Sequence, residues 1–291
     1  MGELFDGSFL RRLEALSYAA RRIPRGGRPA EQSSLALGGG VEFADYRAYA
    51  PGEDLRRVDW LVYLRLGRLY TRLFVEELDL PVHVALDLSD SVFLPPRRGR
   101  AALQAAAAFS WIALSGHDRV RIHPFGSEPL PGYGPVSGKG SGPALLARLA
   151  RLGPSGGTAL VKTLRRIRGL GGRRGLLVVV SDFFEPAGLE PVLEELGRQR
   201  HRLLLVQLVH PADGDPPFSG EVRLVDCETR LGLDVTVTPD VRERYRKAYG
   251  RFQERLRGFA LRRKAYLLPL RVDLDVLSQV ESLFLGGRLA L

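Results

Sequence analysis

The apolar segment Val82-His-Val-Ala-Leu-Asp-Leu88 runs directly into the polar sequence Ser89-Asp-Ser91. A short apolar run that is bounded by polar residues is typical of a buried strand. Two further runs, at residues 175–181 and 202–209, have the same character, and helix-like patterns separate the three. Strands that alternate with helices predict βαβ units, in which helices cover both faces of a mostly parallel sheet. We therefore expect an α/β fold with a doubly wound sheet.

The rest of the chain extends this pattern. We expect further strands at residues 69–76, 119–125 and 266–272, a loop or hairpin at 127–142, and edge strands at 221–225 and 233–237. The spacing of apolar residues predicts helices at 4–22, 100–115, 143–152, 159–167, 188–198, 240–263 and 276–285. The sequence before Pro81 is rich in turns and aromatic residues. It predicts an N-terminal subdomain of a helix and short strands over residues 1–80, followed by the α/β domain over 81–291.

Length and composition exclude several classes of protein. The chain has 291 residues, of which 45% are hydrophobic and 26% charged, and this composition excludes wholesale disorder. Cys227 is the single cysteine, which excludes a disulfide scaffold and a multi-cysteine zinc site. No apolar run is long enough for a membrane helix, and the first residues, Met-Gly-Glu-Leu-Phe-Asp, lack the basic start of a signal peptide. We expect a cytoplasmic protein without a membrane span.

Hydroxyl and carboxylate side chains follow two of the expected strands and precede one helix. Asp87, Ser89 and Ser91 follow the first apolar strand, Thr158 precedes a helix, and Asp182 follows the strand at 175–181. Ligands of such sheets bind at the carboxyl ends of strands, where the strand order reverses. Hard oxygen ligands suit Mg²⁺ or Mn²⁺, and neutral hydroxyls leave the ion able to accept a partner's carboxylate. The alternative is that Asp87 and Ser89 only cap a helix.

The pattern Asp87-x-Ser89-x-Ser91, with Thr158 and Asp182, resembles the metal-ion-dependent adhesion site of von Willebrand factor A domains. The resemblance implies that Ser89, Ser91 and Thr158 ligate the ion through their hydroxyls. Asp87 and Asp182 would act directly or through water. It also implies a von Willebrand factor A-like domain with a bound Mg²⁺ or Mn²⁺, an ion that is either constitutive or arrives with the partner.

A second resemblance rests on residues 42–60, which read Glu-Phe-Ala-Asp-Tyr-Arg-Ala-Tyr-Ala-Pro-Gly-Glu-Asp-Leu-Arg-Arg-Val-Asp-Trp. They resemble the signature of the domain-of-unknown-function 58 family, Glu-Phe, Arg-x-Tyr, Pro-Gly-Asp-Asp-x-Arg-x-Ile-Asp-Trp. Glu53 and Val58 replace the usual Asp and Ile. Members are similar to von Willebrand factor A domains and are often encoded beside a MoxR-type AAA+ ATPase. The resemblance therefore implies such an ATPase, or a client protein, as the partner.

The signature itself permits two interpretations. Pro51-Gly52 predicts a type II turn, because Pro sets φ and Gly supplies a positive φ. The charged residues around it form either a salt-bridged knot that fixes the N-terminal strands on the α/β domain or a docking surface for the ATPase. As partner-binding candidates we name Arg47, Arg56, Asp59 and Trp60.

The motifs of common enzymes are absent from the sequence. The segment Gly134-Pro-Val-Ser-Gly-Lys-Gly140 is one residue shorter than a P-loop and has Gly140 where Ser or Thr should hold magnesium. There is no Gly-x-Ser-x-Gly elbow. The five histidines show no metal-ligand spacing, and His83, within an apolar strand, is expected to be a core residue. We expect a protein that is not an enzyme.

The net charge of +10 is concentrated in one segment. Residues 1–80 are neutral overall, whereas Val241 to Ala265 contains ten bases and two acids. Apolar residues from Val241 to Ala260 form one helical stripe, which predicts that this helix packs on the sheet with its arginines outward. The arginines form a solvated face or bind either an acidic protein or nucleic acid. The candidates are Arg242, Arg246 and Arg255.

These observations favour a metal-ion-dependent protein-interaction module that serves a MoxR-type AAA+ ATPase in protein maturation or complex assembly. Two alternatives remain. One is a nucleic-acid-associated protein that binds through residues 240–263, and the other is a hydrolase that uses the same metal on phosphoesters.

Overall fold

The computed structural model describes residues 4–22, 42–75, 79–94 and 96–285. The chain forms two compact units, one of Met1–Pro24 with Leu80–Leu291 and one of Arg25–Asp79. Part of the expected N-terminal subdomain, including Gly38 to Gly40, lies outside the described residues.

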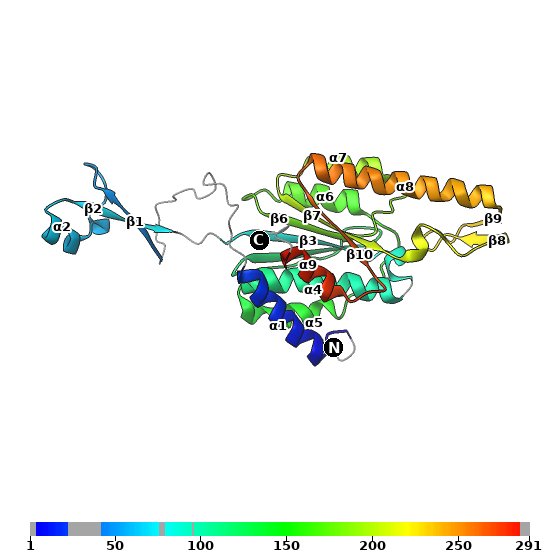
Figure 1. The fold of residues 1–291 in the computed structure, drawn as a ribbon, viewed down its shortest axis with the longest axis horizontal. Helices are drawn as coiled ribbons and strands as arrows, with labels where there is room; N and C mark the ends of the chain where they lie inside the picture. Colours follow the sequence, from blue (N-terminus) through cyan, green and yellow to red (C-terminus); the bar gives the residue numbers. More distant parts are fainter. Residues whose placement is uncertain (1–3, 23–41, 76–78, 95, 286–291) are drawn as a thin grey trace. The chain divides into compact units, whose positions relative to one another are not determined.

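The larger unit is built on a six-stranded sheet with the order β10-β7-β6-β3-β4-β5 (Figure 1). Every neighbouring pair is parallel except β4 and β5. The strands are β3 (Pro81–Asp87), β4 (Arg119–Phe125), β5 (Tyr133–Val136), β6 (Leu176–Ser181), β7 (Arg202–Val209) and β10 (Tyr266–Arg271). All six residues of β6 are buried, as expected for a central strand that is covered on both faces. The prediction of an α/β fold with a mostly parallel sheet is confirmed.

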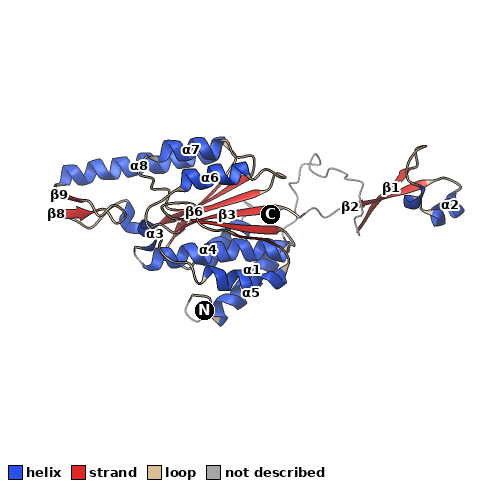
Figure 2. Ribbon diagram, turned by 180° about the vertical axis from the view of Figure 1, so that it is seen from behind, coloured by secondary structure: helices blue, strands red, loops and turns tan. Residues whose placement is uncertain are grey.

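Helices cover both faces of this sheet (Figures 1 and 2). One face carries α1 (Gly7–Arg22), α4 (Pro96–Ser115), α5 (Gly142–Leu149) and α9 (Val276–Leu285). The other carries α6 (Leu160–Gly169), α7 (Leu189–Gly197) and α8 (Pro239–Arg262). Buried alanines from Ala101 to Ala108 allow α4 to pack closely on the sheet. Truncating a fully buried residue such as Phe109 to alanine would cost about 3–5 kcal/mol.

Helix α1 belongs to the larger unit, so the expected N-terminal subdomain of residues 1–80 is wrong in its first part. Phe9, Leu13 and Leu16 are buried in the same core as the strands and α4. Arg12 also forms an ion pair with Asp275, at the start of α9. The amphipathic stripe of α1 thus covers the α/β unit, and the separate unit is Arg25–Asp79 rather than residues 1–80.

Strand β3 lies where the chain changes direction across the sheet. The chain passes from β3 to its neighbour β4, and then crosses to β6 on the opposite side of β3. The carboxyl end of β3 is therefore the switch point at which such sheets bind ligands. The short helix α3 (Asp90–Phe93) begins there.

The edge strands expected at 221–225 and 233–237 form, but they do not join the core sheet. Strands β8 (Gly220–Val225) and β9 (Gly232–Val237) pair only with each other, as a separate antiparallel hairpin. The 3₁₀ helix η3 (Pro211–Asp213) precedes them. No residue of either strand is buried. Alternation of polar and apolar residues here marks a projecting hairpin rather than an edge of the core sheet.

Helix α8 packs on the sheet over only part of its length. Its buried residues are Leu256, Phe259 and Ala260, near its C-terminal end. The expected stripe from Val241 to Phe252 is not buried, and this half of α8 projects from the same end of the larger unit as the β8–β9 hairpin (Figures 1 and 2). The helix extends beyond the sheet, and its first half therefore has no strand to cover.

The segment that resembles a P-loop is a hairpin, as expected from its glycines. It contributes β5, which pairs antiparallel with β4, and the 3₁₀ helix η2 (Lys139–Ser141) that leads into α5.

The smaller unit has β1 (Glu42–Ala48) paired antiparallel with β2 (Tyr70–Val75). Between them lie the 3₁₀ helix η1 (Leu55–Arg57) and the helix α2 (Trp60–Leu66), which was not predicted. Gly52 has a φ of 102° and Glu53 N–H donates to the carbonyl of Ala50 at 3.1 Å. The type II turn at Pro51-Gly52 is thus confirmed.

Candidate metal centre at the carboxyl end of the sheet

The turn after β3 is organised by Asp87, which is 1% exposed. Its Oδ1 accepts from the backbone N–H of Ser89 at 2.9 Å, and its Oδ2 accepts from the hydroxyl of Ser181 at 2.6 Å. Both oxygens are therefore fixed by neighbours. Because β3 and β6 are paired in parallel, their ends lie together and Ser181 of β6 can orient a carboxylate of β3.

Ser89 and Ser91 bring two hydroxyls together. Their Oγ atoms lie 3.1 Å apart, and Ser89 is fully buried. Ser89 stands at the N-cap position of α3, but its side chain makes no capping hydrogen bond. The hydroxyl of Ser89 therefore does not cap α3, whereas Asp87 accepts from the Ser89 N–H just before this helix.

The loop that carries Thr158 runs beside this turn. Asp90 N–H donates to the carbonyl of Gly156 at 2.7 Å, and Gly156 N–H donates to Asp90 Oδ1 at 3.1 Å. Ser155 N–H donates to the carbonyl of Leu88 at 2.8 Å. Thr158 itself is partly buried and lies between Gly157 and the start of α6. The loop thus holds Thr158 close to the serine turn through its backbone.

The end of β6 supplies Asp182, which is also 1% exposed. Its Oδ1 accepts from Phe184 N–H at 3.0 Å. The buried Phe183 has a φ of 64°, in the left-handed region that favours glycine, and its N–H donates to Ser181 Oγ at 2.9 Å. Such strained positions tend to occur where a site requires a particular geometry.

A buried arginine from α4 reaches the same place. Arg98 Nη1 donates to Asp182 Oδ2 at 3.2 Å, and Arg98 Nη2 donates to Asp213 Oδ1 at 2.5 Å. Both oxygens of Asp182 therefore already have partners in the chain. A metal ion at the turn would engage Asp182 through water more readily than directly.

Glu228, at the tip of the β8–β9 hairpin, contacts the serine turn. Its Oε1 accepts from Ser91 Oγ at 3.0 Å. A Cβ atom added at Gly157 would lie 3.2 Å from its Oε2. The carboxylate of Glu228 thus stands between the serine turn and the glycine loop.

Burial raises the pKa of several carboxylates of this region, and Asp87 adds to the rise in the others. Burial raises the pKa of Asp87, against the opposing hydrogen bonds of Ser181 and Ser89. Burial and the nearby Asp87 raise the pKa of Asp182 to about 7. Burial raises the pKa of Glu185 and Glu228, and Asp87 contributes in each case. A cation placed among them would offset both burial and repulsion.

The donor set fits a hard divalent cation. Within the described ranges, no group of three or more His, Cys, Asp or Glu is arranged to hold a metal, but here hydroxyls supply most of the donors. Gln207 lies opposite Ser181 in the sheet register and is 1% exposed. In the described part of the chain its Oε1 has no hydrogen-bond partner, and neither has Arg98 Nε. The unpartnered Gln207 oxygen is compatible with Mg²⁺ or Mn²⁺ and its waters, whereas Arg98 Nε is a donor on a positive group and cannot bind the ion.

A second polar cluster lies within the same sheet, nearer the amino ends of β3 and β7. His83 Nδ1 and His123 Nε2 are 3.0 Å apart, and the His83 and His201 rings lie 4.9 Å apart. Burial, followed by neighbouring positive groups, lowers the pKa of His83 to about 4 and that of His123 to about 3. The pKa of His201 is also lowered. His83 is hydrogen-bonded, as expected, but it is only partly buried, and sequence spacing did not predict this cluster.

Most of the family signature acts within the smaller unit. Arg47 pairs with Glu53, whose Oε2 accepts from Thr71 Oγ1 at 2.9 Å. Asp59 accepts from the N–H groups of α2 and from Tyr46 Oη at 2.8 Å. These contacts resemble the salt-bridged knot of the first interpretation. The knot was expected to fix the N-terminal strands on the α/β domain, whereas these contacts join parts of the smaller unit to one another. Arg56 and Trp60 are exposed, Trp60 by 52%.

The arginines that we named on α8 are bound to acids of the same chain. Arg242 Nε and Arg246 Nη2 both contact Asp215, at 2.6 and 2.7 Å. Arg255 pairs with Glu190. These acidic partners partly neutralise the positive charge of the three arginines.

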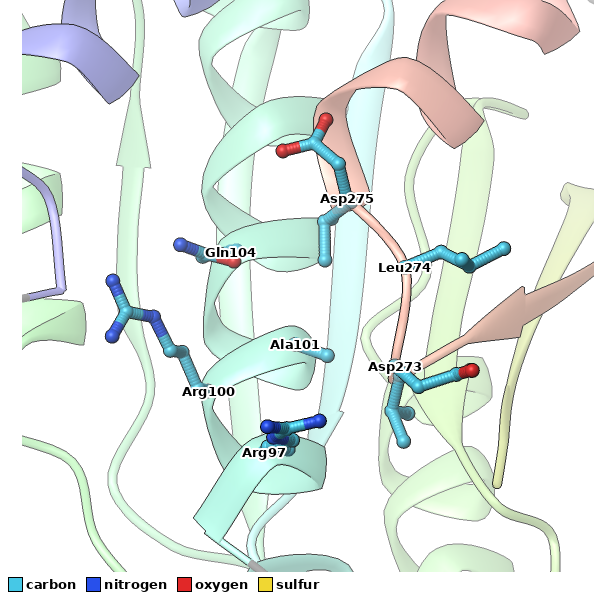
Figure 3. Close-up of a pocket in the computed structure, with 9 residues that line it drawn as sticks. Arg97, Arg100, Ala101, Gln104, Asp273, Leu274 and Asp275 are labelled. Atoms are coloured by element: carbon cyan, nitrogen blue, oxygen red, sulfur yellow. The ribbon is translucent and has the colours of Figure 1, made fainter. Parts of the chain in front are cut away.

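A pocket of about 380 Å³ lies between α4 and the loop that joins β10 to α9 (Figure 3). It is lined by Arg97, Arg100, Gln104, Asp273 and Asp275, among others. Arg271 pairs with Asp273, as Arg12 does with Asp275. None of the residues that line this pocket belongs to the hydroxyl and carboxylate set after β3.

Three residues of the site were not predicted from the sequence. Ser181 stands directly before Asp182, so its place at the strand end was a usable signal. Arg98 and Glu228 had none, because they lie 84 and 137 residues from their partners Asp182 and Ser91. Only the fold brings them together.

Comparisons with known proteins place the chain among relatives of undefined function. The family model described as "Protein of unknown function DUF58" matches residues 45–255. Uncharacterised proteins of Mycobacterium bovis and Mycobacterium tuberculosis are each 25% identical over 285 residues, covering 96% of this chain and 90% of theirs. A shorter match, to an uncharacterised protein of Mycobacterium avium, is 29% identical over 108 residues, 37% of this chain and 63% of that protein.

Among solved structures, an aerotolerance-related membrane protein from Bacteroides fragilis, with multiple mutations to serines, aligns with a TM-score of 0.44 and 13% identity. The alignment covers 72% of this chain and all of that one. Across the described ranges of the present chain, no helix has the length and apolar character to cross a membrane.

Proposed function

We propose that this chain, which belongs to the DUF58 family, is a protein-interaction module that depends on a bound divalent metal ion. We further propose that its larger unit is a von Willebrand factor A-like domain. The support is topological: β3 lies between β4 and β6, and the polar turn follows it at the switch point of the sheet.

The observation that carries the proposal is the hydroxyl pair of Ser89 and Ser91. Two hydroxyls 3.1 Å apart stand beside the buried Asp87, and Ser89 leaves its capping role unused. Each of these three side chains already has a hydrogen-bond partner, but its oxygens keep further lone pairs that a metal ion would engage.

Each residue of the set has an assigned part. Ser89, Ser91 and Thr158 would hold the ion through their hydroxyls, and Asp87, held by Ser181, would support them. Asp182 would act through water, because Phe184 and Arg98 already bind its oxygens. When bound, Mg²⁺ or Mn²⁺ supplies positive charge and a coordination position that accepts a further oxygen ligand.

The ligand that we propose is an Asp or Glu of a partner protein. Neutral hydroxyl ligands leave the ion's charge largely uncompensated, which favours a carboxylate from outside. The family resemblance suggests a MoxR-type AAA+ ATPase, or a client of such an ATPase in protein maturation, as that partner. The proposed role is binding rather than catalysis.

The nucleic-acid alternative gains no support from α8. Arg242 and Arg246 share Asp215, and Arg255 is paired with Glu190. Such pairs reduce the local positive charge that non-specific phosphate binding requires.

The test is binding to a purified MoxR-type ATPase from the same genome, in Mg²⁺ and in EDTA. We expect binding in Mg²⁺ that is lost in EDTA and in Ser89→Ala, but kept in the matched variant Ser110→Ala, whose buried hydroxyl lies on α4. Binding that is as strong in EDTA, and with Ser89→Ala, as it is for the unaltered protein in Mg²⁺ would overturn metal dependence. No binding under any condition would overturn the choice of partner.

A further inference from the structure

The strands of the β8–β9 hairpin bury none of their residues against the larger unit. Val225, Leu231 and Leu233 are more than half exposed. The hairpin therefore has little apolar contact to hold it against the sheet. The carboxylate of Glu228, at the tip of the hairpin, accepts a hydrogen bond from Ser91 of the candidate metal centre.

The tip is shaped to present that side chain. Asp226 Oδ1 accepts from the N–H groups of Glu228 and Thr229, at 2.8 and 2.7 Å. The turn closes through Asp226 N–H to the carbonyl of Leu231 and Arg230 N–H to the carbonyl of Asp226, both at 2.9 Å. An Asx-type turn of this kind fixes the backbone of Glu228 while the arms of the hairpin stay exposed.

The Glu228 carboxylate lies between the two serine hydroxyls and the glycine loop. Its Oε1 accepts from Ser91 Oγ at 3.0 Å, and Ser91 Oγ lies 3.1 Å from Ser89 Oγ. A Cβ atom added at Gly157 would lie 3.2 Å from its Oε2. The position beside Ser91 is the one that an acidic ligand of the ion would occupy.

We propose that Glu228 is an acidic ligand from within the chain, which binds the metal ion at the serine turn in the place that a partner's carboxylate would take. This inference rests on the proposed function. The exposed hairpin lets Glu228 leave without unfolding the core, so a partner must displace the hairpin to reach the ion. Glu228 therefore limits binding to partners whose acidic residue outcompetes it.

The test is titration of Mn²⁺ into the full chain, with proton relaxation of water as a second readout of the bound ion. The variants are Glu228→Gln and, as the control, Glu221→Gln, an exposed residue of the same hairpin with the same change of charge. We expect Glu228→Gln to weaken Mn²⁺ binding about tenfold, with one ion still bound, and Glu221→Gln to leave binding unchanged. The bound Mn²⁺ in Glu228→Gln should relax water faster, because water replaces the carboxylate.

Acetate serves as the carboxylate from outside. It should lower the water relaxation of Mn²⁺-loaded Glu228→Gln at concentrations that leave the unaltered protein unchanged. Equal affinity, relaxation and response to acetate in the two proteins would overturn the role of Glu228 and leave the metal site standing. Failure of the unaltered protein to bind Mn²⁺ would overturn the proposed function, and this inference with it.

Discussion

The site after β3 and the histidine cluster lie in one sheet, yet their ionisable groups are satisfied differently. In the histidine cluster, neighbouring imidazoles hydrogen-bond one another and stay neutral, because burial lowers the pKa of each. In the site after β3, burial raises the pKa of Asp87, and burial together with the nearby Asp87 raises the pKa of Asp182. Arg98 is the cation that the structure places on Asp182, and it is shared with Asp213.

The difference indicates which cluster would gain from an ion. The neutral rings carry no charge that a cation would have to offset, although His201 Nε2 has no hydrogen-bond partner in the described part of the chain. A group of buried carboxylates and hydroxyls gains from a cation, because its charged form is otherwise disfavoured. Function is therefore expected at the carboxyl end of β3 and stability at the histidines.

The largest expected effect is loss of stability in acid. The histidines have pKa values below the usual 6.5, so the unfolded chain binds protons first and the folded chain loses stability as pH falls from 6.5 toward 4. Each imidazole contributes at most about 1.4 kcal/mol per pH unit. Urea unfolding at several pH values should show a shallower acid slope in His123→Gln. An identical slope in the variant would contradict the assignment.

The next effect is stabilisation by Mg²⁺ that grows with pH. Because the pKa of Asp182 is raised from 3.8 to about 7, stability falls as pH rises between these two values, and a cation that binds the charged form offsets that cost. At about 100 times its Kd, Mg²⁺ should add about 2.7 kcal/mol. Thermal unfolding with and without Mg²⁺ should give a larger rise in Tm at pH 8 than at pH 6. A rise in Tm that is equal at both pH values, or no rise at all, would show that the ion does not bind at these carboxylates.

The smallest effect compares two buried serines. Ser181→Ala removes the hydroxyl that orients Asp87 and should lower the free energy of unfolding by about 1 kcal/mol. Ser110→Ala removes a buried hydroxyl that has no partner among the described residues, and should change it by less than about 0.5 kcal/mol. Chemical denaturation of both variants measures the difference. Equal values would show that the Ser181 hydroxyl does not support Asp87.

Much of the larger unit could be predicted from the sequence. β4, β7 and α9 lie at the expected residues, because long apolar runs and regular spacing determine them locally. The residues of β8, β9 and α8 were predicted closely, but the sheet partner of the hairpin and the packing of α8 were predicted wrongly for one physical reason. Alternation and an apolar stripe show that a face is amphipathic, but they do not show whether the sheet extends far enough to cover it.

The site was predicted only in part for a related reason. Asp87, Ser89 and Ser91 lie within one short turn, so their spacing already implied that they act together. Arg98, Glu228 and the histidine cluster depend on which strands and loops become neighbours. Helix α2 was also missed, because its exposed apolar residues do not form a buried stripe.

The most direct measurement of the central claim is calorimetric titration of Mn²⁺ into the protein, into Asp87→Asn and into His123→Gln. We predict one bound ion in the unaltered chain, unchanged affinity in His123→Gln, and affinity that is lower by more than about 100-fold in Asp87→Asn. Absence of binding in the unaltered chain, or equal binding in Asp87→Asn, would contradict a metal centre at the end of β3.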